Sequence, residues 1–239
     1  MERLKQKIAI VTGSSSGIGK AIALRFAEEG AIVVVAARRL AKCEETVAHI
    51  QAAGGTAFPL QTDIAVESQV EQLIAETVRR FQRIDILVNN AGIFGGGRLA
   101  ETSTEAFDKV MSTNLRGTFL CCRAGFTQMK QQGGGTIINM SSVAGVQAWS
   151  GTGTYSASKH AIMALTKSLA DEGRAYHIKV CAICPGGVAD ELVDATAAER
   201  ARSEKIDPFD IAETALYLAC LGPQAVVHQI VVDRIGADW

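Results

Sequence analysis

The sequence predicts a doubly wound α/β fold, in which a parallel sheet of seven strands is covered by helices on both faces. Seven short apolar runs alternate with longer stretches that are patterned as helices. These runs are continuously apolar instead of alternating with polar residues, as expected for strands buried on both faces. Because neither an internal repeat nor a linker interrupts the alternation, we expect a single domain over residues 1–239.

The first half of the chain supplies clear helix signals between its strands. The predicted strands occupy residues 7–13, 31–37, 56–62, 84–90, 135–142, 179–186 and 229–233. In the first helix Ile18, Ile22 and Phe26 follow one another at a spacing of four, and Gly30 comes where a left-handed cap is typical. A second apolar stripe consists of Val70, Leu73, Ile74, Thr77, Val78 and Phe81.

The second half is predicted to contain two long helices, over 104–131 and 154–172. Asp207 precedes Pro208, an arrangement that favours a helix start with a capping side chain. Residues 187–206 lose clear periodicity after the sixth strand. We therefore expect a substrate loop there, with at most partial helical structure, at the sheet edge where ligands bind in such folds.

Composition excludes several classes of protein. The chain has 239 residues, 48% hydrophobic and 21% charged, so it can bury a large core. Its 24 basic and 25 acidic residues give a net charge of -1, which supplies no field for nucleic acid or an anionic membrane. No stretch approaches about 18 apolar residues, and the apolar start is too short for a signal peptide. We expect a cytoplasmic protein without nucleic-acid or membrane partners.

The cysteines and histidines predict no metal site. Cys181 and Cys184 form a C-x-x-C pair, but positions i and i+3 of a strand point to opposite faces. No second pair completes a ligand set, and the four histidines lack the spacing for a metal or for a Ser-His-Asp triad. We therefore expect structural, mostly buried cysteines and no hydrolase chemistry.

A glycine-rich turn, TGSSSGIG at residues 12–19, joins the first predicted strand to the first helix. Gly13 allows a sharp turn, Gly17 lets the backbone approach a pyrophosphate, and Gly19 permits close packing of helix on strand. A merely tight connection is the alternative, but the strand-turn-helix setting favours dinucleotide binding. The predicted cofactor contacts here are Gly13, Ser15, Ser16, Gly17, Ile18 and Gly19.

The G-x-x-x-G-x-G spacing resembles that of the short-chain dehydrogenase/reductase family, and further motifs follow in the family's order over about residues 7–235. They are Asn89-Asn90-Ala91-Gly92, Asn114 within TNLRG, the Ser142…Tyr155-x-x-x-Lys159 constellation and Pro185-Gly186. The resemblance implies a Rossmann-type fold, a nicotinamide cofactor and hydride transfer between a carbonyl and an alcohol. It also implies cofactor contacts at Asp63, Ile64, Asn90, Ala91, Gly92, Tyr155, Lys159, Pro185, Gly186 and Val188.

The end of the second strand indicates NADP(H) as the cofactor. In related folds a carboxylate about 20 positions after the glycines accepts the ribose 2′-hydroxyl of NAD. Here the chain has Ala36-Ala37-Arg38-Arg39, and guanidinium groups pair well with a 2′-phosphate. Arg38 is the stronger candidate, because Arg39 is equally compatible with a solvated helix start.

Tyr155 and Lys159 lie four residues apart on a predicted helix and so share one face. A phenol titrates near ~10 in water, and we expect the neighbouring ammonium to lower that pKa. By resemblance, Tyr155 exchanges a proton with the substrate oxygen, Ser142 hydrogen-bonds that oxygen, Lys159 holds the nicotinamide ribose and Asn114 anchors a water. Each residue alone has a structural alternative, such as a helix surface or a cap, but together with the glycine turn they favour catalysis.

The chain departs from the family pattern twice. After Pro185-Gly186 the family usually has threonine at the position of Asp190, which cannot donate a hydrogen bond when ionised. We therefore expect backbone groups around Val188 to hold the nicotinamide carboxamide, and we leave Asp190 outside the predicted site. The family's frequent D-G-G is replaced by Asp233-Arg234-Ile235-Gly236, which should affect packing or a subunit contact.

The predicted function is an NADP(H)-dependent oxidoreductase acting on a small carbonyl or alcohol substrate. Phe94, residues 95–97, residues 143–149 and the 187–206 loop should surround the reacting carbon, but they do not identify the substrate. The alternatives are a 3-oxoacyl-acyl-carrier-protein reductase and a catalytically silent NADP-binding regulatory or scaffold protein. The resemblance also implies a homo-oligomer, a tetramer or else a dimer, formed through the two long helices.

Overall fold

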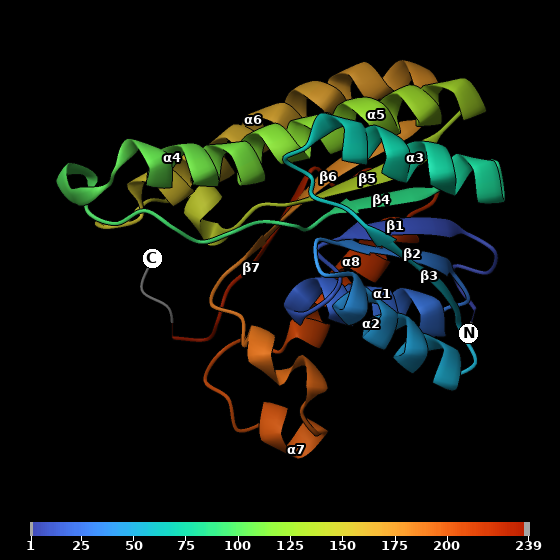
Figure 1. Cartoon of the computed structure of the whole chain (residues 1–239), viewed down its shortest axis with the longest axis horizontal. Coiled ribbons are helices and arrows are strands. Elements are labelled where there is room, and N and C mark those ends of the chain that lie inside the picture. The colour runs from blue at the N-terminus through green and yellow to red at the C-terminus, as the bar shows by residue number, and fades with distance from the viewer. Residues whose placement is uncertain (1, 237–239) are drawn as a thin grey trace.

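The computed structural model describes residues 2–236 and confirms the predicted doubly wound sheet (Figure 1). All seven strands pair in parallel, in the spatial order β3-β2-β1-β4-β5-β6-β7. The strands are β1 (Ile8–Thr12), β2 (Ile32–Ala37), β3 (Thr56–Gln61), β4 (Ile86–Asn89), β5 (Gly135–Met140), β6 (Ile178–Pro185) and β7 (Gln229–Val232). Chain order reverses between β1 and β4, which makes their carboxyl ends the switch point where ligands bind in such sheets.

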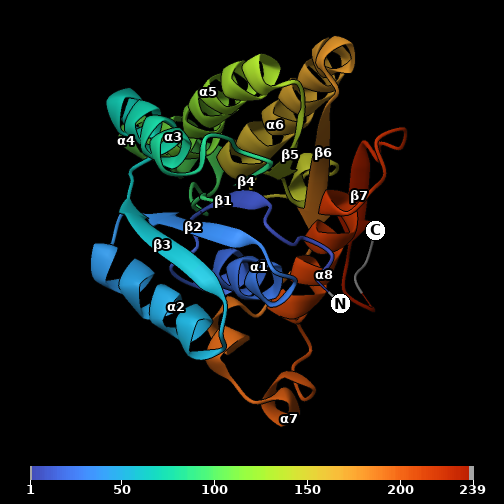
Figure 2. The ribbon, with the colours of Figure 1, turned by 90° about the vertical axis from the view of Figure 1, so that its right-hand side faces the viewer.

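Helices cover both faces of the sheet, as Figure 2 shows. One layer contains α1 (Gly17–Glu28), α2 (Leu40–Ala52) and α8 (Pro208–Ala219). The other contains α3 (Glu67–Phe81), α5 (Gly117–Gln132) and α6 (Gly153–Gly173). Successive strand side chains point alternately into the two layers, so each layer has its own apolar cluster, and burial on both faces accounts for the continuously apolar strands.

The local signals read from the sequence hold at the helix ends. Gly30, just after α1, has a φ of +85°, the left-handed region expected for such a cap. Asp207 caps α8 by accepting a hydrogen bond from the backbone N–H of Phe209 at 2.9 Å. Within β6, Cys181 packs in the layer of α1 and α8, whereas Cys184 contacts Met163 of α6 on the opposite face.

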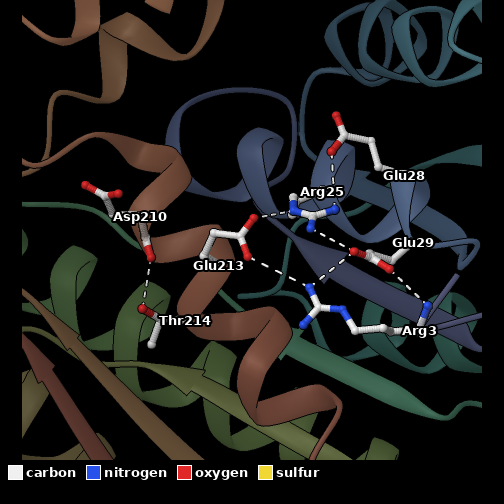
Figure 3. A network of polar contacts seen from close by, with 7 residues as sticks. All are labelled: Arg3, Arg25, Glu28, Glu29, Asp210, Glu213 and Thr214. Atoms are coloured by element: carbon white, nitrogen blue, oxygen red, sulfur yellow. Dashed lines mark hydrogen bonds and ion pairs between the residues drawn. The ribbon is translucent and has the colours of Figure 1, made fainter. Parts of the chain in front are cut away.

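The start of the chain is attached to α1 and α8 by a buried carboxylate (Figure 3). Glu29, only 5% exposed, accepts hydrogen bonds from the backbone N–H of Arg3 at 2.9 Å and from the Arg25 guanidinium at 2.8 Å. The backbone of Arg3, together with the two guanidinium groups, lowers the pKa of Glu29 to about 2. Because Arg25 also pairs with Glu213 of α8, this network holds the carboxyl end of α1 against α8 and the start of the chain.

The helix predicted over 104–131 is not regular. It consists of α4 (Thr104–Val110), a π-helical turn η2 (Met111–Arg116) and α5. The wider turn contains the buried Asn114, whose amide bonds to the backbone of Ile93 instead of facing solvent. A π turn of this kind is common at functional sites, and no sequence pattern predicts it.

The segment 187–206 is partly helical, within the range expected for it. It contains the 3-10 turn η5 (Asp190–Asp194) and the short helix α7 (Ala197–Arg200), and a parallel bridge joins Val188 to Ile206. Other short 3-10 turns are η1 (Leu99–Glu101), η3 (Val143–Gly145) and η4 (Arg174–Tyr176). Within residues 2–236, none of the helices combines the length and apolar character that crossing a bilayer requires.

Candidate active site

A cavity of about 790 Å³ opens along the carboxyl ends of the strands, at the switch point between β1 and β4. Every residue predicted for the site lines this cavity, with the single exception of Asn114. The cavity also contains Phe94, and Asp190 and Glu191 of the 187–206 loop, which were expected only in a general way around the reacting carbon. Residues that the sequence reasoning did not select are Ala37, Thr62, Ile93, Thr113, Met140 and Ser141. The fold therefore brings the glycine turn and the tyrosine-lysine pair, which are about 140 residues apart in the chain, into one space.

The glycines of the turn are required by close neighbours. Gly13 has a φ of +67°, and a side chain there would place its Cβ 2.8 Å from the Cα of Ala91. A Cβ at Gly19 would collide with the Asn90 amide and the Gly13 carbonyl. Ser16 begins α1 without using its side chain as a cap, and it lines the cavity together with Gly17 and Ile18. This cradle fits the pyrophosphate of a dinucleotide.

Thr12 connects the end of β1 to the Asn90-Ala91 segment after β4, and the sequence analysis did not select it. Its Oγ1 accepts hydrogen bonds from the backbone N–H groups of Asn90 at 3.0 Å and Ala91 at 3.1 Å, and donates to the carbonyl of Val88. Asn90 in turn donates from its side chain to the Thr12 carbonyl at 3.0 Å. The available signal was the position of Thr12 as the last residue of β1, where a side chain can reach the chain that leaves the neighbouring strand.

Arg38 and Arg39 lie just beyond β2 and line the same cavity. Neither guanidinium forms an ion pair with any residue in the range 2–236. Across from them, Asp63 turns one carboxylate oxygen toward its own loop, where it accepts from the N–H of Ala65 at 3.0 Å. Two unneutralised guanidinium groups at this edge suit a phosphate better than a bare ribose hydroxyl.

Lys159 and Tyr155 face each other in the cavity. The Lys159 Nζ lies 5.6 Å from the centre of the Tyr155 ring and donates to the carbonyl of Met140 at 2.8 Å. Because the ammonium is buried, desolvation lowers the pKa of Lys159 to about 8. This position lets Lys159 change its protonation near neutral pH, as a proton relay must.

The expected direction of the Tyr155 pKa is wrong for this structure. Burial of the ring raises the pKa of Tyr155 above its ordinary value, and the Ser142 hydroxyl counteracts this only in part. Desolvation of the ring is the largest cause, and the negative charge of Asp190 raises the pKa of Tyr155 further. The phenol is therefore protonated at neutral pH, which suits a proton donor better than a base.

Ser142 combines a structural and an active-site position. It follows β5, caps η3 by accepting from the N–H of Ala144 at 3.1 Å, and donates to the Pro185 carbonyl at 3.3 Å. Its neighbour Ser141 also lines the cavity, and its hydroxyl donates to the Lys159 carbonyl at 3.0 Å. The two serines thus attach the start of α6 and the end of β6 to the end of β5.

Asn114 acts on the site from behind the cavity wall. Its oxygen accepts from the N–H of Ile93 at 2.8 Å, and its amide nitrogen donates to the Ile93 carbonyl at 2.9 Å and to Ser158 at 3.1 Å. A Cβ on Gly92 would lie 3.3 Å from the Asn114 oxygen and 3.6 Å from the Lys159 Nζ. Asn114 therefore positions the 92–93 backbone directly against Lys159.

The chain after β6 brings backbone groups to the cavity. Gly187 accepts from the N–H of Ile206 and Ala189 donates to the carbonyl of Ile206, both at 2.9 Å. The N–H and C=O of Val188 have no partner among the described residues, and Val188 lines the cavity. These free groups fit the predicted role of Val188 toward a carboxamide.

Asp190 lies in the cavity although it was left outside the predicted site. Its Oδ1 accepts from the backbone N–H of Ile18 at 3.1 Å. Burial of the carboxyl group raises the pKa of Asp190 above its ordinary value, although the Ile18 N–H acts against this. The departure from the family pattern at this position was a signal, but nothing local revealed a contact with residue 18.

Within the described part of the chain, no group of histidine, cysteine, aspartate and glutamate side chains is arranged to hold a metal ion. All six cysteines are free, and five of them are buried.

Comparison with known proteins identifies the family of the chain. A family model described as short chain dehydrogenase matches residues 7–201. An uncharacterized oxidoreductase of Thermotoga maritima is 45% identical over 77% of this chain and 73% of its own length. A 2-(R)-hydroxypropyl-CoM dehydrogenase of Xanthobacter autotrophicus is 39% identical over 89% of this chain and 91% of its own length. A 3-oxoacyl-(acyl-carrier-protein) reductase of Staphylococcus aureus is 41% identical over 81% and 79%.

Among solved structures, a short-chain type dehydrogenase/reductase from Mycobacterium marinum superposes with a TM-score of 0.87 at 34% identity, covering 96% of this chain and 95% of the other. Proteins of this family are oxidoreductases that use NAD or NADP and act on small molecules. The chain belongs to the short-chain dehydrogenase family.

Proposed function

We propose that the protein is an NADP(H)-dependent oxidoreductase that interconverts a ketone or aldehyde with the corresponding alcohol. The observation that carries this proposal is that Tyr155 and Lys159 line the same cavity as the glycine turn and Arg38. A cofactor bound on the glycine turn would therefore end beside a proton donor. The whole chain would act as one dinucleotide-binding domain in the cytoplasm, with 187–206 as its substrate loop.

The proposed hydride and proton transfers balance in atoms and charge. The bound cofactor supplies or accepts a hydride at the reacting carbon. In reduction, the Tyr155 hydroxyl donates its proton to the substrate oxygen, and the Ser142 hydroxyl donates a hydrogen bond to the same oxygen. The Lys159 ammonium stabilises the phenolate that remains and passes a proton toward it from solvent. In alcohol oxidation each proton moves in the reverse direction.

The test of turnover is a panel of ketones, aldehydes and alcohols assayed by NADPH absorbance. We expect at least one carbonyl compound to be reduced with NADPH at a rate clearly above the enzyme-free rate. Tight NADPH binding measured by fluorescence, without turnover on any compound, would instead favour the alternative of a silent NADP-binding regulatory or scaffold protein.

The preference for NADP over NAD is proposed from the two unpaired guanidinium groups beyond β2. In Arg38→Asp a repelling carboxylate replaces an attracting cation. We expect the NADP/NAD ratio of kcat/KM to fall about a hundredfold, equivalent to about 3 kcal/mol. Arg39→Asp is the matched control, for which we expect a change of less than about tenfold. An unchanged ratio in Arg38→Asp would make the NADP assignment wrong.

A second candidate substrate class is a 3-oxoacyl group on a carrier. It is favoured by the similarity to the reductase of Staphylococcus aureus. Acetoacetyl-carrier and acetoacetyl-CoA therefore belong in the panel beside simple ketones. A kcat/KM for the carrier substrate that exceeds that of every small ketone would replace the generic carbonyl reductase by this second candidate.

We also propose a homotetramer, or else a dimer, formed through α4, α5 and α6. An apolar groove on this surface is lined by Met111, Leu115, Phe119 and Leu165, and Phe119 is 43% exposed. A second copy of the chain would cover this apolar area. Sedimentation that shows only monomer at micromolar concentration would overturn this proposal.

A further inference from the structure

The carboxylate of Asp190 lies at the amino end of α1, where a dinucleotide would bind its phosphates. Asp190 Oδ1 accepts from the N–H of Ile18 at 3.1 Å, and a Cβ on Gly17 would be only 2.6 Å from the same oxygen. The first N–H groups of a helix after a glycine turn are the groups that hold a pyrophosphate in dinucleotide-binding folds. The chain thus places one of its own anions on the anion-binding turn.

This contact is supported by the way η5 is held against α1. Lys20 of α1, whose side chain is 6% exposed, pairs with Asp194 at 2.5 Å. Val193 packs into the core layer of α1 and α8. The backbone bridge between Val188 and Ile206 joins the two ends of the 187–206 segment. Asp190 as a residue is exposed although its carboxyl group is partly buried against α1, so its side chain can leave the turn without disturbing these anchors.

We propose that Asp190 is an internal competitor for the phosphate-binding turn, so that it sets the affinity of the cofactor and makes that affinity depend on pH. The proposal rests on the use of a nicotinamide dinucleotide, and it holds equally for NAD and NADP and for any substrate. The cofactor displaces the carboxylate from Ile18, and the displaced carboxylate then lies close to two negatively charged phosphates. Asp190 is therefore an affinity-determining residue.

The sign of the pH effect follows from charge. The ionised carboxylate competes for the Ile18 N–H and repels the phosphates, whereas the protonated carboxyl does neither strongly. Because cofactor binding favours the protonated form, affinity falls as pH rises through the titration of Asp190, whose pKa is raised by burial. The charged and titratable groups around Asp190 are Glu191 and Asp194 of η5, Lys20 of α1, Tyr155 and Lys159 of α6, Lys205 from the end of the same segment, and Arg38 and Arg39 of the same cavity.

The first test measures the dissociation constant of NADH by cofactor fluorescence from about pH 5 to about pH 9. NADH is chosen because its bridging phosphates do not titrate in this range, unlike a 2′-phosphate. We expect Asp190→Asn to bind NADH about tenfold more tightly than the parent protein at the alkaline end, and we expect this advantage to narrow toward the acid end. Taking the ratio of the two proteins cancels other titrations, including that of Lys159.

Glu191→Gln is the matched control, because Glu191 lines the same cavity and its change removes the same charge. Its carboxylate is not on Ile18 but pairs with Lys205. We expect this variant to follow the parent curve within about twofold. If Glu191→Gln tightened binding as much as Asp190→Asn, the effect would be one of general charge and the proposal would be wrong.

The second test needs no activity and no cofactor. The ¹⁵N chemical shift of the Ile18 amide should titrate with the Asp190 carboxyl in the parent protein and lose this titration in Asp190→Asn. Parallel NADH binding curves for the parent and Asp190→Asn would overturn this inference while leaving the proposed function intact. If no variant bound NADH or NADPH although its melting curve showed that it was folded, both this inference and the proposed function would be overturned.

Discussion

Two regions that border the same cavity are held in opposite ways. The catalytic edge, consisting of residues 111–116, 140–142 and 155–159, is fixed by buried hydrogen bonds such as Lys159 to Met140 and Asn114 to Ile93. The segment 187–206 is anchored in the core by Val193 and Ile206, and elsewhere it is held by polar contacts near the surface, including Lys205 with Glu191 and the capping box of Thr196 with Glu199. In the proposed function, the first region would position the reacting atoms and the second would cover them.

The difference teaches how one fold can keep its chemistry while changing its specificity. A buried hydrogen bond left without its partner costs about 1–3 kcal/mol, so the catalytic edge resists change. An exposed ion pair contributes about 0–1 kcal/mol and weakens in salt, so the covering segment tolerates substitution. Asp190, an unusual residue for the family, stands at the start of that tolerant segment.

The largest expected effect is that of removing the proton donor from the catalytic edge. Tyr155→Phe removes the proton donor but keeps the ring that packs against Phe94, with ring centres 5.0 Å apart. We expect kcat to fall about a thousandfold, within the range for loss of general acid catalysis, and the dissociation constant of NADPH to change less than about threefold. Stopped-flow turnover and cofactor fluorescence measure the two quantities. A kcat close to the parent value would exclude Tyr155 as the donor.

A smaller effect concerns the buried ammonium of the catalytic edge. The pKa of Lys159 is about 8 in the folded protein against 10.5 in the unfolded chain, so between these values the unfolded chain binds more protons. Stability therefore rises with pH in that window, and below pH 8 the cost of burying the charge is fully present. Relative to Lys159→Met, we expect the parent to gain about 2 kcal/mol between about pH 7 and about pH 9.5.

Urea unfolding of both proteins at several pH values measures this difference, because titrations common to the two cancel. A constant difference across the window would mean that Lys159 titrates at its ordinary value and is solvated in the folded protein.

The smallest effect compares the loss of one hydroxyl in each region. Ser141→Ala removes a buried donor to the Lys159 carbonyl, and we expect a loss of about 1 kcal/mol in unfolding free energy. Thr196→Ala removes the cap of the exposed α7, and we expect less than about 0.5 kcal/mol, because this segment can open without global unfolding. Urea unfolding checks the first value, and trypsin cleavage after Arg202 or Lys205 should accelerate about threefold in the second variant. Equal losses of stability in both variants would remove the contrast between the regions.

Much of the fold was accessible from local pattern. The seven apolar runs lie within two residues of the observed strands, since burial on both faces imposes a composition that any one strand displays by itself. The glycine turn was equally readable, because Gly13 and Gly17 meet a backbone requirement at their own positions. The candidate site was predicted from the order of the family's motifs along the chain. All of its predicted residues except Asn114 line one cavity.

The sequence by itself determined the sheet, its helices and the residues that gather at the switch point, because each of these depends on side-chain type and short-range spacing. The tertiary structure decided the π turn at Asn114, the raised pKa of Tyr155 and the contact of Asp190 with Ile18 across 172 positions. Desolvation and long-range contacts depend on what packs around a group in space, and neighbours along the chain carry no record of it.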